Sequence, residues 1–189
     1  MRVNIDEIKE GGLRRAWDLG REAVDEIVKG GDAGYRARSA LHVEGDLQRV
    51  ERRVLFQARA SAPLTATCGR CLSPVEVEVP IDFQLTFVPE EARAGEEPGR
   101  AHGDHPAARV AGSFDADDVN EERYSGKTID LDPAVREQLL LALPGYPVCN
   151  EGCKGLCSVC GANLNDGDCG CNRRVPDPRW AGLEKFKRK

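Results

Sequence analysis

The eight cysteines are the residues of this chain whose type and spacing could do chemistry. Six of them lie in CNEGCKGLCSVCGANLNDGDCGC at 149–171, and the other two form CGRC at 68–71. A C-x-x-C turn folds two thiolates onto one ion, and a neighbouring glycine relieves the tight backbone. Eight sulfurs are enough for two complete Cys₄ sites. The candidate metal ligands are Cys68, Cys71, Cys149, Cys153, Cys157, Cys160, Cys169 and Cys171.

The sequence alone does not choose how these cysteines are grouped, because eight can be divided into two sets of four in about 35 ways. Loop closure favours joining the C-x-x-C at 157–160 to the C-x-C at 169–171, since the segment between them is short and rich in turn residues. The C-x-x-C at 68–71 would then take Cys149 and Cys153. Such a site would tie two distant parts of the chain together.

Zinc is the metal that a Cys₄ set predicts, because four thiolates suit its tetrahedral preference and closed sites of this kind are usually structural. A [4Fe–4S] cluster is an alternative, but the C-x₂-C-x₂-C run of many ferredoxins is absent. A thioredoxin-like redox pair is a third, although neither C-x-x-C lies between a strand and a helix of a βαβ unit. We expect two structural Zn²⁺ sites.

The elements that must position these cysteines are mainly strands. Residues 75–87, VEVEVPIDFQLTF, alternate apolar and polar side chains, which predicts a half-buried strand with Pro80 at a bulge or an edge. Residues 54–66 alternate in the same way, so two long strands flank TCGRCLSP. Shorter strands are expected near Val3 and Ile5, at 13–19, at 39–46 and at 128–131.

Two helices are expected to cover this sheet. Residues 21–29 fit a short helix that ends at a pair of glycines. Asp132 is placed to cap a second helix with Pro133 at its first position, and Pro144 stops it. Its predicted buried stripe consists of Val135, Leu139, Leu140 and Leu143. The predicted fold class is α+β, a β-rich antiparallel core with one or two covering helices and a C-terminal Cys-rich zinc-knuckle segment.

Composition divides the chain into four parts. Residues 1–88 form the expected β-rich core with the knuckle of Cys68 and Cys71, and residues 124–148 complete it with a strand and a helix. Between them, residues 89–123 are acidic, rich in Ala, Gly and Pro and without periodicity, which predicts a disordered loop. Residues 149–189 carry the remaining cysteines and a basic tail.

The net charge of −5 argues against a protein that coats nucleic acid through bulk positive charge. The cations near the cysteines have two explanations: they balance the charge near −2 of each Cys₄–Zn²⁺ unit, or they contact RNA phosphates. The candidate RNA-binding residues are Arg70, Lys154, Arg173, Arg174, Arg179, Lys185, Lys187, Arg188 and Lys189.

Neither a membrane span nor a secretory signal is visible. No run approaches the roughly 18 consecutive apolar residues of a membrane helix, and MRVNIDEIKE lacks a basic segment followed by an apolar one. These features predict a cytoplasmic protein without a membrane partner. In that reducing compartment, closely spaced cysteines are more often metal ligands or redox centres than disulfides.

The sequence resembles the DUF177 family, bacterial and plastid proteins also called large ribosomal RNA subunit accumulation protein YceD. The resemblance rests on CGRCLSPVEVEV, on IDLDPAVREQLLLALPGYPVC, and on CKGLCSVCGANLN followed by a C-x-C and DPRWAGLEKFK. It covers most of residues 36–189. It implies a role in the accumulation of large-subunit ribosomal RNA, through its processing or through assembly of the subunit.

The sequence leaves three classes of function to compare. The first is a non-enzymatic factor that binds ribosomal RNA or pre-ribosomal particles through the basic tail. The second is an adaptor for ribosomal proteins or assembly enzymes, through the acidic segment and a tail helix. The third is a thiol redox or RNA-processing enzyme, which is disfavoured because no phosphate-cradling loop, HExxH helix or nucleophile elbow is present. We expect the first, with no catalytic residues and no small-molecule substrate.

Overall fold

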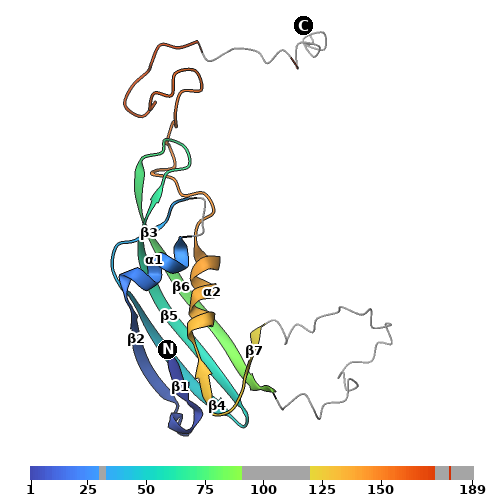
Figure 1. Ribbon diagram of the computed structural model, residues 1–189. Helices are drawn as coiled ribbons and strands as arrows, with labels where there is room; N and C mark the ends of the chain where they lie inside the picture. Colours follow the sequence, from blue (N-terminus) through green and yellow to red (C-terminus); the bar gives the residue numbers. More distant parts are fainter. Residues whose placement is uncertain (30–32, 91–119, 173–178, 180–189) are drawn as a thin grey trace.

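The computed structural model describes residues 1–29, 33–90, 120–172 and 179. Its strands form a six-stranded sheet in the order β2-β4-β5-β6-β7, with β3 beside β5, and a separate two-stranded sheet of β1 and β8. Strand order and the covering helices confirm the predicted α+β class (Figure 1). The strands are β1 Arg2–Asn4, β2 Leu13–Leu19, β3 Arg36–Ala37, β4 Leu41–Val50, β5 Arg53–Thr67, β6 Pro74–Pro89, β7 Glu121–Tyr124 and β8 Thr128–Asp130.

A long antiparallel hairpin of β5 and β6 forms the centre of the sheet. Its register is continuous from Val54 opposite Phe87 to Thr67 opposite Pro74, so the two strands reverse at the first C-x-x-C. Pro80 pairs with Ser61 without a bulge. Because β7 pairs only with Thr86–Pro89, Pro80 lies on an edge of the described sheet, where its missing N–H costs no ladder hydrogen bond.

Two helices, α1 Arg21–Val28 and α2 Asp132–Ala142, lie across the same face of this sheet (Figure 1). Val24 and Val28 of α1 are buried in a core that also holds the alternating side chains of β4, β5 and β6. Val135 and Leu139 of α2 lie in the same core. One face of the sheet is therefore covered, as the alternation of apolar and polar residues requires.

The start of α2 differs from the sequence prediction. Leu131 occupies the N-cap position and makes no side-chain cap hydrogen bond. The backbone N–H of Asp132 instead donates to the carboxylate of Asp130 at 3.1 Å, so the aspartate two residues earlier satisfies it. Leu140 is 42% exposed and does not belong to the buried stripe, because it lies about 100° around the helix from Leu139.

The segment predicted as a loop at 89–123 also has strand at both ends. β6 extends through Pro89, and β7 begins at Glu121 and runs parallel to β6. Parallel pairing needs a long crossover connection, and four residues of mixed polarity give no pattern from which it can be predicted. Residues 91–119 lie outside the described residues, and the four-part division of the chain stays a prediction.

Candidate metal centres

The structure brings the eight cysteines together as two groups of four. The first group joins Cys68 and Cys71, at the turn between β5 and β6, to Cys149 and Cys153, which follow α2. Within each group all the sulfur atoms lie within 4.8 Å of one another. The second group consists of Cys157, Cys160, Cys169 and Cys171. This is the grouping that loop closure favours.

The spacing of the sulfur atoms fits a tetrahedral ion and not a disulfide. In the first group, the Sγ atoms of Cys71 and Cys149 are 3.7 Å apart, and those of Cys68 and Cys153 are 4.0 Å apart. A tetrahedral zinc with Zn–S bonds of about 2.3 Å places its sulfurs about 3.8 Å apart. A disulfide would need about 2.05 Å. The donor set and its spacing thus suit Zn²⁺.

N–H donors around the first group favour its thiolate forms. The backbone N–H groups of Arg70 and Cys149 each donate to Cys68 Sγ at 3.4 Å. Backbone donors, first that of Cys71, lower the pKa of Cys68 to about 6. The side-chain amide of Asn165 donates to Cys153 Sγ at 3.3 Å and lowers the pKa of that thiol. Such donors hold ligating sulfurs in the form and orientation a metal needs.

Without a cation, the sulfurs of each group cannot all ionise together. Hydrogen bonding to Cys153 and to the other neighbouring sulfurs raises the pKa of Cys149 to about 12. In the second group, backbone N–H donors, first that of Cys160, lower the pKa of Cys157 to about 6. Hydrogen bonding to Cys160 and the other neighbouring sulfurs raises the pKa of Cys171 to about 12. The positive charge of a bound divalent cation offsets this repulsion between thiolates. Thiols that coordinate such an ion therefore lose their protons.

The two C-x-x-C turns share one backbone form. The residue that follows the second cysteine has a left-handed conformation in each, with φ of 61° at Leu72 and 75° at Gly161. Its N–H donates to the carbonyl of the first cysteine, at 2.9 Å from Leu72 to Cys68 and 2.8 Å from Gly161 to Cys157. Glycine adopts this conformation freely, whereas leucine does so at a cost of about 1–2 kcal/mol.

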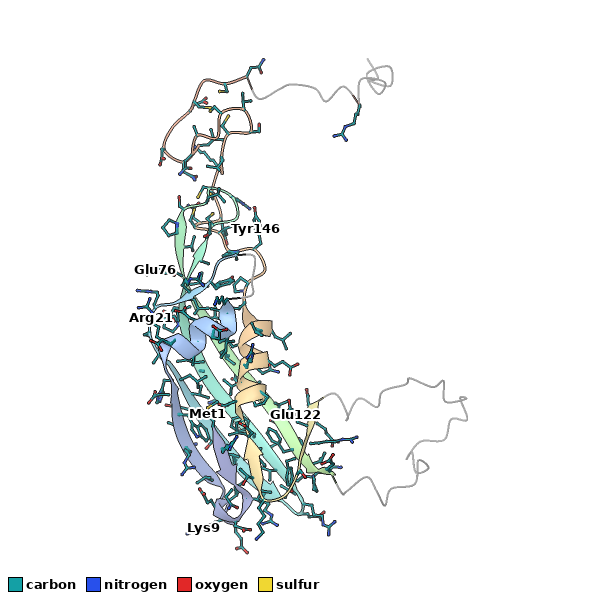
Figure 2. All side chains as sticks on the ribbon, viewed as in Figure 1. Met1, Lys9, Arg21, Glu76, Glu122 and Tyr146 are labelled. Carbon is teal, nitrogen blue, oxygen red and sulfur yellow. The ribbon has the colours of Figure 1, made fainter. Side chains whose placement is uncertain are left out.

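Two tyrosines hold the segment after α2 against the sheet. The hydroxyl of Tyr35, which precedes β3, donates to the carbonyl of Pro144. Farther along, the hydroxyl of Tyr146 donates to the carbonyl of Gly69 at 2.7 Å (Figure 2). A Cβ atom at Gly69 would lie 2.4 Å from the Tyr146 ring, so only glycine lets the ring lie this close. Together these contacts bring Cys149 to the hairpin turn.

Asn165 connects the two groups. It lies between the cysteines of the second group, yet its amide donates to Cys153 of the first, and its oxygen accepts from the backbone N–H of Lys154 at 2.8 Å. The backbone N–H of Leu156 also donates to the Arg70 carbonyl at 3.2 Å. Sequence reasoning missed Asn165 because an asparagine in a turn-rich segment is already explained by the turn.

The predicted RNA-binding cations are only partly placed. Arg70 lies at the first group, where its Nη1 atom donates to the carbonyls of Glu151 at 3.0 Å and Cys153 at 3.2 Å. Lys154 lies beside the same group, and Arg179 is exposed. The other predicted cations lie outside the described residues: Arg173, Arg174, Lys185, Lys187, Arg188 and Lys189.

Comparison with known proteins matches residues 56–187 to the family described as large ribosomal RNA subunit accumulation protein YceD. The matched region contains both cysteine groups. This chain belongs to the YceD family. No solved structure matches it.

Curated relatives of this YceD chain include bacterial and plant proteins. An uncharacterized protein of Mycobacterium tuberculosis is 31% identical over 143 residues, which cover 76% of this chain and 60% of the relative. The maize protein named large ribosomal RNA subunit accumulation protein YCED homolog 1, chloroplastic, is 29% identical over 187 residues, which cover 92% of this chain and 61% of the maize protein. The Arabidopsis thaliana protein of the same name is 23% identical over 164 residues, which cover 81% of this chain and 50% of that protein. The chain spans about 60% of the length of the first two.

The YceD assignment agrees with the resemblance seen in the sequence motifs. The names of the plant relatives refer to accumulation of the large ribosomal RNA subunit. Neither helix of the described structure is long and apolar enough to cross a membrane.

Proposed function

We propose that this chain is a non-enzymatic ribosome-biogenesis factor that supports the accumulation, processing or assembly of large-subunit ribosomal RNA. The observation that carries the proposal is the family match, which spans most of the hairpin, α2 and both cysteine groups. The names of the plant relatives support the same role.

Zinc is proposed as a structural element. Each group offers four sulfurs, which fill the coordination sphere of Zn²⁺ and leave no position for a substrate. When bound, the ion supplies a cross-link and neutralises thiolate charge. In the first group, the residues around the ion fix the β5–β6 turn to the segment after α2. The reducing cytoplasm, which we propose as the compartment, keeps such thiols available for metal.

A non-enzymatic role is supported by the surroundings of the titratable groups. His42 lies on the exposed surface of β4, where its Nδ1 atom is 2.7 Å from an Asp18 carboxylate oxygen. Asp130 accepts the hydrogen bond at the start of α2.

The proposal is tested by depleting the protein in its own host and measuring the ratio of large-subunit to small-subunit ribosomal RNA by electrophoresis. We expect the ratio to fall, and to be restored by the parent chain but not by Cys71→Ser. An unchanged ratio after depletion would contradict the proposed function. Metal analysis of the purified chain should give two zinc ions for each chain.

RNA contact through the basic tail is tested separately. Replacing the last five residues together with Arg173 and Arg174 by neutral residues should weaken binding to protein-free large-subunit RNA and reduce its salt dependence. Equal binding before and after this change would exclude the tail as the RNA contact.

An adaptor that binds ribosomal proteins is the second candidate, because the described cysteine end is poor in cations. In residues 68–78 and 143–172, the cations are Arg70 and Lys154. The carboxylates in the same ranges are Glu76, Glu78, Glu151, Asp166 and Asp168. This excess of negative charge favours a basic protein over a phosphate backbone.

A further inference from the structure

Leu72 combines two features that folding alone does not require. It has a left-handed backbone with φ of 61°, and its side chain is 62% exposed to solvent. The equivalent residue of the second knuckle is Gly161, which makes the same turn without steric cost. An exposed leucine at a position suited to glycine gains little from burial, so neither packing nor turn geometry explains it.

Three of the six large exposed apolar residues of the described chain lie at the cysteine end: Leu72, Tyr146 and Val159. Tyr146 is also 62% exposed and lies against the same knuckle, with its hydroxyl on the Gly69 carbonyl. Figure 2 places Tyr146 beside the β5–β6 turn, at the end opposite Lys9. Of the other three, Leu140 and Leu141 lie in the last turn of α2, and Val50 lies at the end of β4. Leu72 ends the turn whose Gly69 contacts Tyr146, and exposed apolar residues that share one turn mark an interaction surface.

The charge around Leu72 and Tyr146 indicates what kind of partner fits. Adding Arg36 of the neighbouring β3, and Arg38 just after that strand, to the two cations of this end still leaves fewer cations than carboxylates. Arg38 is moreover paired with Glu76 at 2.9 Å. Four thiolates with one bound divalent ion would add a charge near −2 beneath the surface. A phosphate backbone would be repelled here, whereas a basic protein segment would be attracted.

We propose that Leu72 and Tyr146 form an apolar docking tip for a basic protein segment of the large ribosomal subunit, one that carries an apolar side chain between its cations. The inference rests on the proposed function and names a partner for it. Leu72 supplies the apolar contact, Tyr146 supplies a rigid amphipathic surface, and the surrounding carboxylates select the positive charge.

The proposal is tested by replacing Leu72 with residues that tolerate the left-handed turn. Leu72→Gly removes the side chain and the strain together, and Leu72→Asn keeps a side chain that accepts this backbone. The control is Val50→Asn, which changes an aliphatic residue that is 60% exposed at the far end of β4. Binding to purified large ribosomal subunits is measured by co-sedimentation, and folding by urea unfolding and zinc content.

We expect both Leu72 variants to bind large subunits at least ten-fold more weakly than the parent, while Val50→Asn binds as the parent does. Leu72→Gly should keep its zinc and unfold at the same or a higher urea concentration than the parent. A loss of binding would then not come from a loss of structure. Parent-like binding of both Leu72 variants would overturn the proposal.

The identity of the partner is checked with protein-free large-subunit RNA and by sedimentation of the chain alone. The proposal expects the Leu72 variants to bind protein-free RNA as the parent does and to have its oligomeric state. Equal weakening on subunits and on RNA would make the tip an RNA contact, and loss of a parent dimer would make it a self-association surface. Either result would overturn the proposal. If the parent binds neither subunits nor RNA, the proposed function fails as well.

Discussion

Removing one ligand from each cysteine group should affect the sheet very differently. Cys71 and Cys149 are 78 residues apart, so a metal bound between them closes a loop that contains β6, β7, β8 and α2. If this cross-link acts as a disulfide does, closing 78 residues stabilises the fold by about 4.5 kcal/mol. Cys160 and Cys169 are about 9 residues apart, for which the same relation gives about 2.6 kcal/mol.

We therefore expect Cys71→Ser to lower the free energy of unfolding of the sheet by about 4 kcal/mol, a large part of the total for a domain of this size. Cys160→Ser should change it by less than about 0.5 kcal/mol, because the loop it opens contains no strand of the sheet. In a Trp180→Phe background, Trp17 fluorescence reports on the sheet. The ring of Trp17 packs edge-on against the ring of Phe56, with 6.3 Å between the ring centroids. Urea unfolding with saturating zinc measures both variants.

Three results would refute this reasoning. If Cys160→Ser lowered the Trp17 transition as much as Cys71→Ser, the cysteine groups would not divide as the structure has them. If either substitution removed all the zinc, the two sites would not be independent. An unchanged transition in both variants would show that the metal does not cross-link the core.

Three further changes follow from single contacts. Gly69→Ala should destabilise the fold by about 1–3 kcal/mol in thermal unfolding, because its Cβ would lie 2.4 Å from the ring of Tyr146. Asn165→Ala should weaken zinc binding at the first group by roughly 10-fold or more in a chelator competition, since it removes an N–H donor to a ligating sulfur. The hydrogen bond from His42 to Asp18 raises the histidine pKa, so its contribution to stability is present below about pH 6.5 and is lost as pH rises through the folded pKa. Asp18→Asn should therefore lower the NMR titration midpoint of His42.

Matched controls make the first two of these results interpretable. Gly152→Ala should be tolerated, because its Cβ would lie at an ordinary 3.5 Å from the Asn150 side chain. Asn150→Ala removes one N–H donor to Cys149 and should weaken zinc binding less than Asn165→Ala, which also loses the contact with Lys154. If Gly152→Ala destabilised as much as Gly69→Ala, or if the His42 midpoint did not move, the corresponding contact would not have the effect we assign to it.

Much of the fold could be predicted from periodicity. The alternation at 54–66 and 75–87 predicts the central hairpin, because side chains on successive strand residues face opposite sides of the sheet. The Pro80 edge position was one of two predicted outcomes. The end of α2 was predicted well and its start was not, since Asp130 and Asp132 are equally suited to accept a hydrogen bond and only the backbone geometry selects between them.

By itself the sequence determined the number and type of the candidate metal ligands, because C-x-x-C spacing acts over a few bonds. It favoured the grouping of the cysteines only through the length of the loops. Tertiary structure alone brings Cys149 to Cys71, through the β5–β6 register and the contacts of Tyr35 and Tyr146. It alone shows Leu72 exposed in a left-handed turn, since exposure and backbone conformation depend on parts of the chain that are distant in sequence.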